Sequence, residues 1–114
     1  MKTKSKNKIK TKVIKLRYLR VVEMPYSILS GADLSGLNLQ HANFYMSVLC
    51  NADLTNSNLI YANLNYADLG NANLKGANIV FAELKGTQMT NCKIDRDWEY
   101  KLSEVQRKQV EWIN

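Results

Sequence analysis

The sequence predicts a solenoid, a rod built from stacked repeat units. An apolar residue, Leu in ten of 14 cases, returns every five positions from Leu29 to Ile94. The residue two positions earlier is Ala in eight of the 14 repeats, and the residue one position earlier is Asp or Asn in nine. A period of five fits neither an α-helix nor a β-strand. A fixed internal period instead indicates units that bury their apolar side by stacking on their neighbours.

The 14 periodic apolar residues, called centres below, predict the interior of the rod. Each should point inward with the small residue two positions before it, because only a small side chain fits beside a bulky one in a narrow interior. The Asp or Asn between them should face outward or bond to a turn, because an unpaired buried carboxylate is too costly. The centres are Leu29, Leu34, Leu39, Phe44, Leu49, Leu54, Leu59, Leu64, Leu69, Leu74, Ile79, Leu84, Met89 and Ile94.

These repeats resemble the A(D/N)LXX motif of the pentapeptide-repeat family over about residues 27–96. The resemblance implies an all-β fold, a right-handed quadrilateral parallel β-helix with four repeats in each coil. Fourteen repeats would then form about three and a half coils, with residues 20 apart stacked on one face. The expected organisation is a basic N-terminal tail and cap segment over 1–22, the β-helix over 23–96, and a capping or dimerisation helix over 97–114.

The first 20 residues carry nine Lys or Arg and no acidic residue. They are interpreted as a solvated tail, as an electrostatic arm for nucleic acid or an anionic membrane surface, or as an organelle-targeting segment. An ordered segment from about Val13 to Val22 is expected to cover the first open coil, with Pro25 marking entry into the rod. The candidate arm residues are Lys8, Lys10, Lys12, Lys15, Arg17 and Arg20.

The C-terminal end is expected to form a short helix over about 103–113 that either folds over the last coil or mediates dimerisation, as in related family members. Ser103-Glu104-Val105-Gln106 is typical of a capping box, with Ser103 as the N-cap and Gln106 reaching back. Glu104 and Lys108 have the spacing of an i,i+4 ion pair. The candidate cap or oligomerisation residues are Trp98, Leu102, Val105 and Trp112.

One face of the expected rod is more apolar than the others. His41, Tyr61 and Phe81 stand 20 residues apart and should therefore stack in one column. A contiguous apolar strip on a rod usually marks a surface that something covers. Cover by residues 9–22 and simple stacking between coils are the structural alternatives. The candidate protein-binding residues are His41, Ile60, Tyr61, Val80 and Phe81.

Elsewhere the same outward positions carry Ser, Thr, Asn, Gly and Lys. Tyr45, Met46 and Tyr66 are interpreted as isolated exceptions to that polar pattern. The sequence therefore predicts one apolar face rather than several.

The sequence predicts no enzyme. His41 is the single His and has no placeable catalytic partner, while Asp33 and Asp53 are explained by the repeat. No pair of Cys and His has metal-ligand spacing, so no metal, cofactor or small-molecule substrate is expected. Cys50 should face outward and Cys92 inward, which predicts two free thiols in a reducing compartment, the cytoplasm or an organelle stroma. Neither a transmembrane helix nor a secretory signal is expected.

Three functions remain open. The first is a non-enzymatic interaction or scaffold module whose partner is an unidentified protein or a second copy of the chain. The second, implied by the resemblance, is a DNA-mimic modulator of a type II topoisomerase such as gyrase. Mimicry needs a long acidic rod, whereas residues 26–94 carry four acidic and three basic side chains, a net charge of −1. The third is salt-sensitive binding of nucleic acid or an anionic surface through the basic tail.

Overall fold

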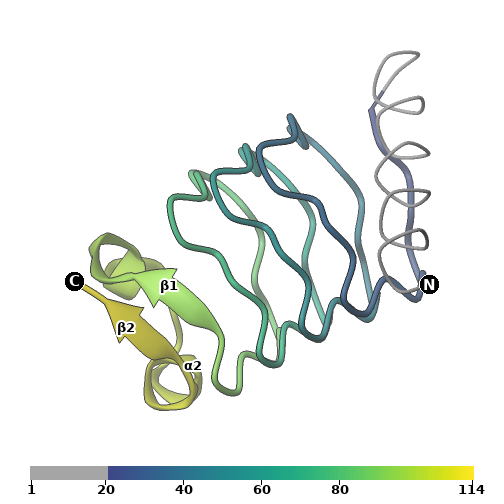
Figure 1. The fold of residues 1–114 in the computed structure, drawn as a ribbon. Helices are drawn as coiled ribbons and strands as arrows, with labels where there is room; N and C mark the ends of the chain where they lie inside the picture. Colours follow the sequence, from purple (N-terminus) through teal and green to yellow (C-terminus); the bar gives the residue numbers. More distant parts are fainter. Residues whose placement is uncertain (1–20) are drawn as a thin grey trace.

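The computed structural model describes residues 21–114, which wind into a rod of successive coils (Figure 1). Parallel β-bridges join residues 20 apart, from Glu23 with Asn43 to Asn73 with Lys93. Because each side of a coil takes five residues, each coil has four sides. The cap segment expected from Val13 and the candidate arm residues up to Arg20 lie outside the described residues.

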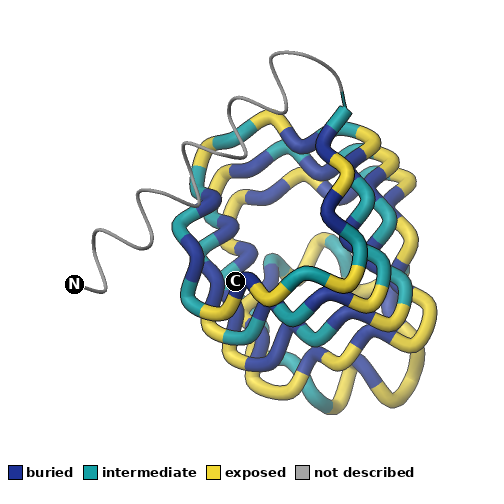
Figure 2. Tube along the Cα trace, turned by 90° about the vertical axis from the view of Figure 1, so that its right-hand side faces the viewer, coloured by how far each residue is buried: buried dark blue, intermediate teal, exposed yellow. Residues whose placement is uncertain are grey.

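The interior of the rod is a continuous apolar core. All 14 predicted centres are buried, and 12 of them are at most 1% exposed. Most of the small residues are buried beside them, whereas Ser27 and Leu37 are half-buried. Figure 2 shows the buried positions recurring around successive coils. The prediction that centres and small residues point inward is therefore confirmed, and Leu37 departs because it is too bulky for the position it occupies.

The rod begins one repeat earlier than the sequence pattern indicated. Val22 is fully buried and Met24 is 9% exposed, so they occupy the small and the central positions of an additional repeat. Glu23 between them forms a β-bridge with Asn43. Pro25 is therefore part of this repeat and does not mark an entry into it. The sequence pattern does not reveal this repeat, because Val22 and Glu23 replace the usual Ala and the usual Asp or Asn.

The Asp and Asn preference of the repeat is explained by a turn. In all nine repeats that carry Asp or Asn before the centre, its side-chain Oδ1 accepts a hydrogen bond from the backbone N–H two residues on. Distances range from 2.9 Å at Gly70 to 3.2 Å at Gln40. These Asx turns leave each carboxylate or amide hydrogen-bonded and at least partly exposed. The side chain thus shapes the backbone that leads into the next corner.

The four corners of each coil use the left-handed backbone region. Every residue two positions after a centre, from Tyr26 to Asn91, has a positive φ between 54° and 73°. Gly and Asn tolerate this conformation with little strain. A backbone N–H on each side donates to a carbonyl of the next coil, as in Leu49 N–H to Asp68 O at 2.8 Å.

Four short elements close the C-terminal end of the rod (Figure 1). They are strand β1 (Lys93–Asp95), the 3-10 helix η1 (Arg96–Lys101), helix α2 (Glu104–Gln109) and strand β2 (Glu111–Ile113). Strand β2 pairs with β1 in parallel, with Ile94 opposite Trp112. The chain thus returns to the rod and covers the edge of the last coil.

The predicted helix over 103–113 is only partly correct. Its capping box is confirmed, since the Ser103 side chain accepts from Gln106 N–H and the Gln106 side chain accepts from Ser103 N–H. The helix ends at Gln109, however, and Trp112 lies on β2. Pairing with the open edge of β1 satisfies backbone groups that a longer helix would leave exposed.

Candidate protein-binding surface

The predicted column of aromatic rings is present. The rings of His41 and Tyr61 stack with centroids 5.0 Å apart and planes 3° apart, and those of Tyr61 and Phe81 stack at 5.0 Å and 22°. The spacing follows from the fold, because neighbouring coils lie about 4.8 Å apart. His41, Tyr61 and Phe81 are called the aromatic column below.

The aromatic column remains open to solvent along the rod. Tyr61 is 51% and Phe81 64% exposed, whereas Ile60 and Val80 beside them are half-buried. Because the rings face one another, they present mainly their edges outward. A nucleobase or a sugar ring that needs a free aromatic face finds none between two members of this column. The exposed edges instead suit contact with apolar side chains.

A second aromatic group, which the sequence pattern did not reveal, lies at the neighbouring corner. Tyr45 contacts Tyr26 edge-on at 5.7 Å between centroids and Tyr66 edge-on at 6.0 Å. Tyr26, Met46 and Tyr66 occupy one column of corners, and all three are exposed. The interpretation of Tyr45, Met46 and Tyr66 as isolated exceptions is therefore wrong. These four residues, Tyr26, Tyr45, Met46 and Tyr66, are called the tyrosine cluster.

The two groups border the same side of the rod, because His41 and Met46 are successive corners. Between them the outward residues of successive coils are Glu23, Asn43, Asn63 and Glu83. The Asn43 amide donates to Glu23 at 3.1 Å, so part of this polar surface is already paired. The aromatic column, the tyrosine cluster and the surface between them are called the aromatic side.

The cap residues predicted from sequence pack mainly within the chain. Leu102 is buried, while Trp98 and Trp112 are half-buried against the core. Val105 is 66% exposed, so the expectation that it covers the last coil is wrong. The helix turns Gln106 inward in its place, and its amide donates to Leu84 O at 2.8 Å and Thr87 O at 3.1 Å.

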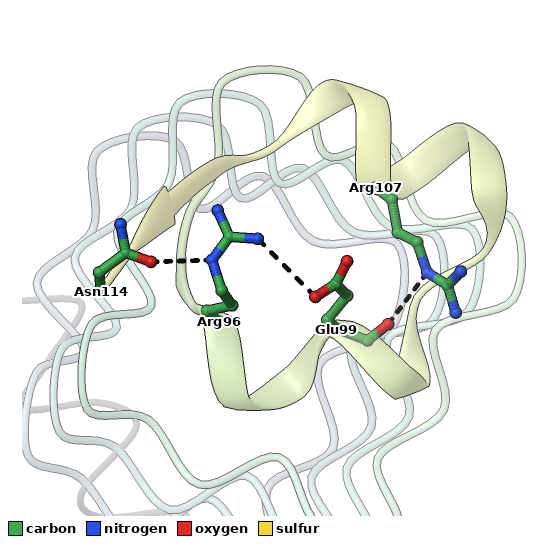
Figure 3. A network of polar contacts seen from close by, with 4 residues as sticks. All are labelled: Arg96, Glu99, Arg107 and Asn114. Atoms are coloured by element: carbon green, nitrogen blue, oxygen red, sulfur yellow. Dashed lines mark hydrogen bonds and ion pairs between the residues drawn. The ribbon is translucent and has the colours of Figure 1, made fainter.

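A network of polar contacts joins the elements of the cap (Figure 3). The Arg96 guanidinium lies 5.1 Å from the Trp112 ring, and its Nε donates to Asn114 Oδ1 at 2.8 Å. Arg96 also pairs with Glu99 at 3.7 Å, and Arg107 Nε donates to Glu99 O at 3.1 Å. The predicted pair of Glu104 and Lys108 is present at 3.7 Å and is strongly exposed, so it contributes little to stability.

Asp33 and Asp53, the carboxylate pair examined as a possible catalytic site, accept hydrogen bonds within their own turns. Asp33 Oδ1 accepts from the Ser35 hydroxyl at 2.6 Å, and Asp53 Oδ1 from the Thr55 hydroxyl at 2.7 Å. Within residues 21–114, no three His, Cys, Asp or Glu side chains gather as they would around a metal ion. No helix in that part of the chain has the length and apolar character to cross a membrane.

Both cysteines are free thiols, as expected, with Cys50 half-buried and Cys92 buried. Burial raises the pKa of Cys92 from 9.0 to about 12. Below pH 9 the thiol is protonated in both the folded and the unfolded chain. Between pH 9 and 12 only the unfolded chain ionises, so folding stability falls as the pH rises through this window.

We expect this thiol to destabilise the protein by up to about 4 kcal/mol as the pH rises from 9 to 12. Cys92→Ala, which restores the commonest residue of its repeat position, should lack this component. Urea unfolding of both proteins at several pH values measures the difference. Parallel curves for the two proteins would contradict the burial of this thiol.

Comparison with known proteins agrees with the repeat seen in the structure. The family described as Pentapeptide repeat region matches residues 22–97. The chain therefore belongs to the pentapeptide-repeat family, whose architecture is the right-handed quadrilateral β-helix. Comparison with curated protein sequences gave no match.

Solved structures of pentapeptide-repeat proteins are similar to the chain at modest TM-scores. HetL from Nostoc sp. strain PCC 7120, involved in heterocyst differentiation regulation, has 29% identity over 61% of this chain, with a TM-score of 0.40. The chain spans only 39% of HetL. An Arabidopsis thaliana thylakoid lumen protein has 29% identity over 81% of this chain and 68% of its own, with a TM-score of 0.46. Rfr23 from Cyanothece 51142 has 28% identity over 66% of this chain and 68% of its own, with a TM-score of 0.43.

Proposed function

We propose that this protein is a non-enzymatic interaction module that binds a partner protein through its aromatic side. Pentapeptide-repeat proteins are in general interaction modules, and the described residues offer a rigid rod with one apolar side. The proposal includes His41, Ile60, Tyr61, Val80 and Phe81, to which the tyrosine cluster is now added.

The observation that carries the proposal is the distribution of strained corners. Eight of the 14 corners from Tyr26 to Asn91 carry Gly or Asn, which suit a positive φ. The six others, which carry a bulky or aromatic side chain, all belong to the two columns that border the aromatic side. A left-handed backbone costs such residues about 1–2 kcal/mol each. Strain confined to one side favours a function for the side chains that are kept there. The six are Tyr26, His41, Met46, Tyr61, Tyr66 and Phe81.

A protein partner fits this side better than nucleic acid does. The aromatic edges offer apolar contact, which favours association by burial of area. The stacked rings of the aromatic column leave few faces for bases, and the outward residues between the columns include Glu23 and Glu83. Topoisomerase modulation by DNA mimicry is the weaker candidate, because residues 26–94 carry a net charge of only −1. Binding through the candidate arm Lys8–Arg20 would be a separate activity.

The finer organisation belongs to the same proposal. A rod of 15 repeats, about three and three-quarter coils, spans 22–96, and residues 97–114 cap it rather than dimerise. Intramolecular burial of Leu102 and Gln106 supports a cap. Residues 1–21 form the basic segment, and the two free thiols suit the cytoplasm or an organelle stroma.

The double variant Tyr61→Asn, Phe81→Asn tests the proposal. Asn is the residue that four other corners carry, so the loss of ring stacking is offset by relief of backbone strain. We expect the free energy of unfolding to change by less than about 1 kcal/mol. Recovery of the partner protein from a lysate at moderate salt should fall at least tenfold.

A matched control variant replaces two stacked residues at the opposite corner of the coil. Asn51→Gly, Asn71→Gly removes two exposed side chains there without adding backbone strain, and it should leave partner recovery unchanged. Solution mass, measured by light scattering, separates a second copy from a different protein. Undiminished recovery and an unchanged mass in a folded double variant would overturn the proposal.

A further inference from the structure

A recess of about 380 Å³ lies where the aromatic side meets the C-terminal cap. The rod contributes Ala82, Leu84, Lys85 and Gly86, and the cap contributes Lys101, Leu102, Ser103 and Gln106. The Tyr66 ring lies so closely against Gly86 that an added Cβ there would clash with it. The tyrosine cluster therefore borders the recess directly.

Three of the four buried residues that line the recess are apolar, and they form its floor. Ala82, Leu84 and Leu102 are at most 9% exposed. The Gln106 amide is fully used, because it donates to Leu84 O and Thr87 O and its oxygen accepts from Ser103 N–H. Ser103 Oγ accepts from Gln106 N–H and keeps its own proton to donate.

Two lysine residues line the recess, and no acidic residue does. Lys101 Nζ donates to Ala82 O at 3.2 Å, which uses one of its three donors. Within residues 21–114, the ion pairs of the cap are Arg96 with Glu99 and Lys108 with Glu104, and neither involves Lys85 or Lys101. Partial burial lowers the pKa of Lys101, as expected for a cation that lacks a counter-ion. Glu83 is the nearest acidic residue in sequence to Lys85, and it is exposed.

We propose that this recess receives the C-terminal carboxylate of the partner protein, together with the apolar side chain of its last residue. The proposal rests on the proposed function and names the chemistry that the aromatic side recognises. Lys85, Lys101 and the Ser103 hydroxyl would bind the carboxylate, while the floor takes the apolar side chain. Two separate ammonium groups at an apolar floor suit one carboxylate better than an extended polyphosphate backbone.

The test compares N-acetyl-leucine with N-acetyl-leucinamide, which differ only in the carboxylate. Titration of the full chain, followed by amide chemical shifts in NMR, should show the acid bound with a dissociation constant on the order of millimolar. Shifts should centre on Ala82–Gly86 and Lys101–Ser103. The amide should bind at least tenfold more weakly, and added salt should weaken the acid.

Two variants and a control measure how much each lysine side chain contributes to binding of the acid. Lys85→Gln should weaken binding of the acid about threefold, as for an exposed ion pair, and Lys101→Gln about tenfold. Lys75→Gln, on an exposed position outside the recess, should change nothing. Equal binding of acid and amide, or no effect of the two recess variants, would overturn the proposal. Tighter binding of inorganic phosphate than of the acid would reassign the recess and also overturn it.

The failure of this inference can be told from the failure of the proposed function. A partner that is lost with Tyr61→Asn, Phe81→Asn but retained with Lys85→Gln, Lys101→Gln overturns the carboxylate site and leaves the interaction module in place. Loss with both double variants supports both. Retention with the aromatic variant removes the proposed function whatever the recess binds.

Discussion

Replacing Leu64 with Asp should abolish the folded rod, whereas replacing its neighbour Asn63 with Asp should leave it intact. Leu64 is fully buried among the interior residues of successive coils. The change removes about 2–5 kcal/mol of packing and places a carboxylate where no partner is available, at a cost of several kcal/mol more. Together these terms are comparable with the whole stability of a small domain, about 5–15 kcal/mol.

Asn63→Asp is the matched control, because it introduces the same residue one position away, where the side chain faces outward. Asn63 Oδ1 accepts from Asn65 N–H at 3.0 Å, and Asp can accept the same hydrogen bond. We therefore expect Asn63→Asp to change the free energy of unfolding by less than about 0.5 kcal/mol. Circular dichroism and thermal unfolding measure both variants. A folded, cooperatively melting Leu64→Asp protein would mean that this side chain does not lie in the interior.

Truncation of Phe44 should have the second-largest effect. Phe44 is the largest fully buried side chain and the one aromatic centre in the rod. Phe44→Ala leaves a cavity that two neighbouring coils cannot close and should cost about 3–5 kcal/mol. Urea unfolding reports the change as a shift of the midpoint at constant slope.

Phe44→Leu provides the matched control, because Leu occupies ten of the 14 predicted centres. We expect it to cost less than about 1.5 kcal/mol, since the smaller change in volume can be absorbed by repacking. Equal costs for the two variants would show that the interior responds to the loss of the ring itself and not to the volume it fills.

The repeat made the rod predictable from sequence. A centre every five residues and an Asp or Asn before it are local signals, and the structure repeats the same turn wherever they occur, as at Asp53 and Asn63. Prediction weakened where the residues departed from the pattern. Val22 and Met24 form a repeat without its usual Ala and Leu, so its Tyr26 was not aligned with Met46 and Tyr66. The tyrosine cluster was missed for that reason.

Only the part of the cap that is set by local sequence, the start of its helix, could be predicted. The capping box of Ser103 and Gln106 is a local motif, so the start of α2 could be placed. Where the helix ends depends on β2 pairing with the edge of β1, which is a long-range contact. The same contact places Trp112 on a strand, and it turns Gln106 rather than Val105 toward the rod. The recess at Lys85 and Lys101 forms where the cap packs against the rod, and no sequence motif predicts it.

Backbone strain and solvent exposure together favour a binding role for the aromatic side. Stacking could explain why His41, Tyr61 and Phe81 stand above one another, since each pair contributes about 0.5–1.5 kcal/mol. The left-handed backbone at each of these corners costs a similar amount, so stacking alone is a poor reason to retain bulky residues there. The same holds for Tyr26 and Tyr66 at the neighbouring corner. The proposed contact with a partner protein supplies a benefit that stacking alone does not.

Photo-crosslinking from position 61 tests the central claim most directly. Tyr61 is replaced by p-benzoylphenylalanine in the full chain, and Asn51, two sides away on the opposite corner, is replaced in a second protein. After irradiation in a cell extract, we expect one discrete protein adduct from position 61 and none from position 51. Adducts of equal yield from both positions, or none from position 61, would contradict an interaction module that binds through its aromatic side.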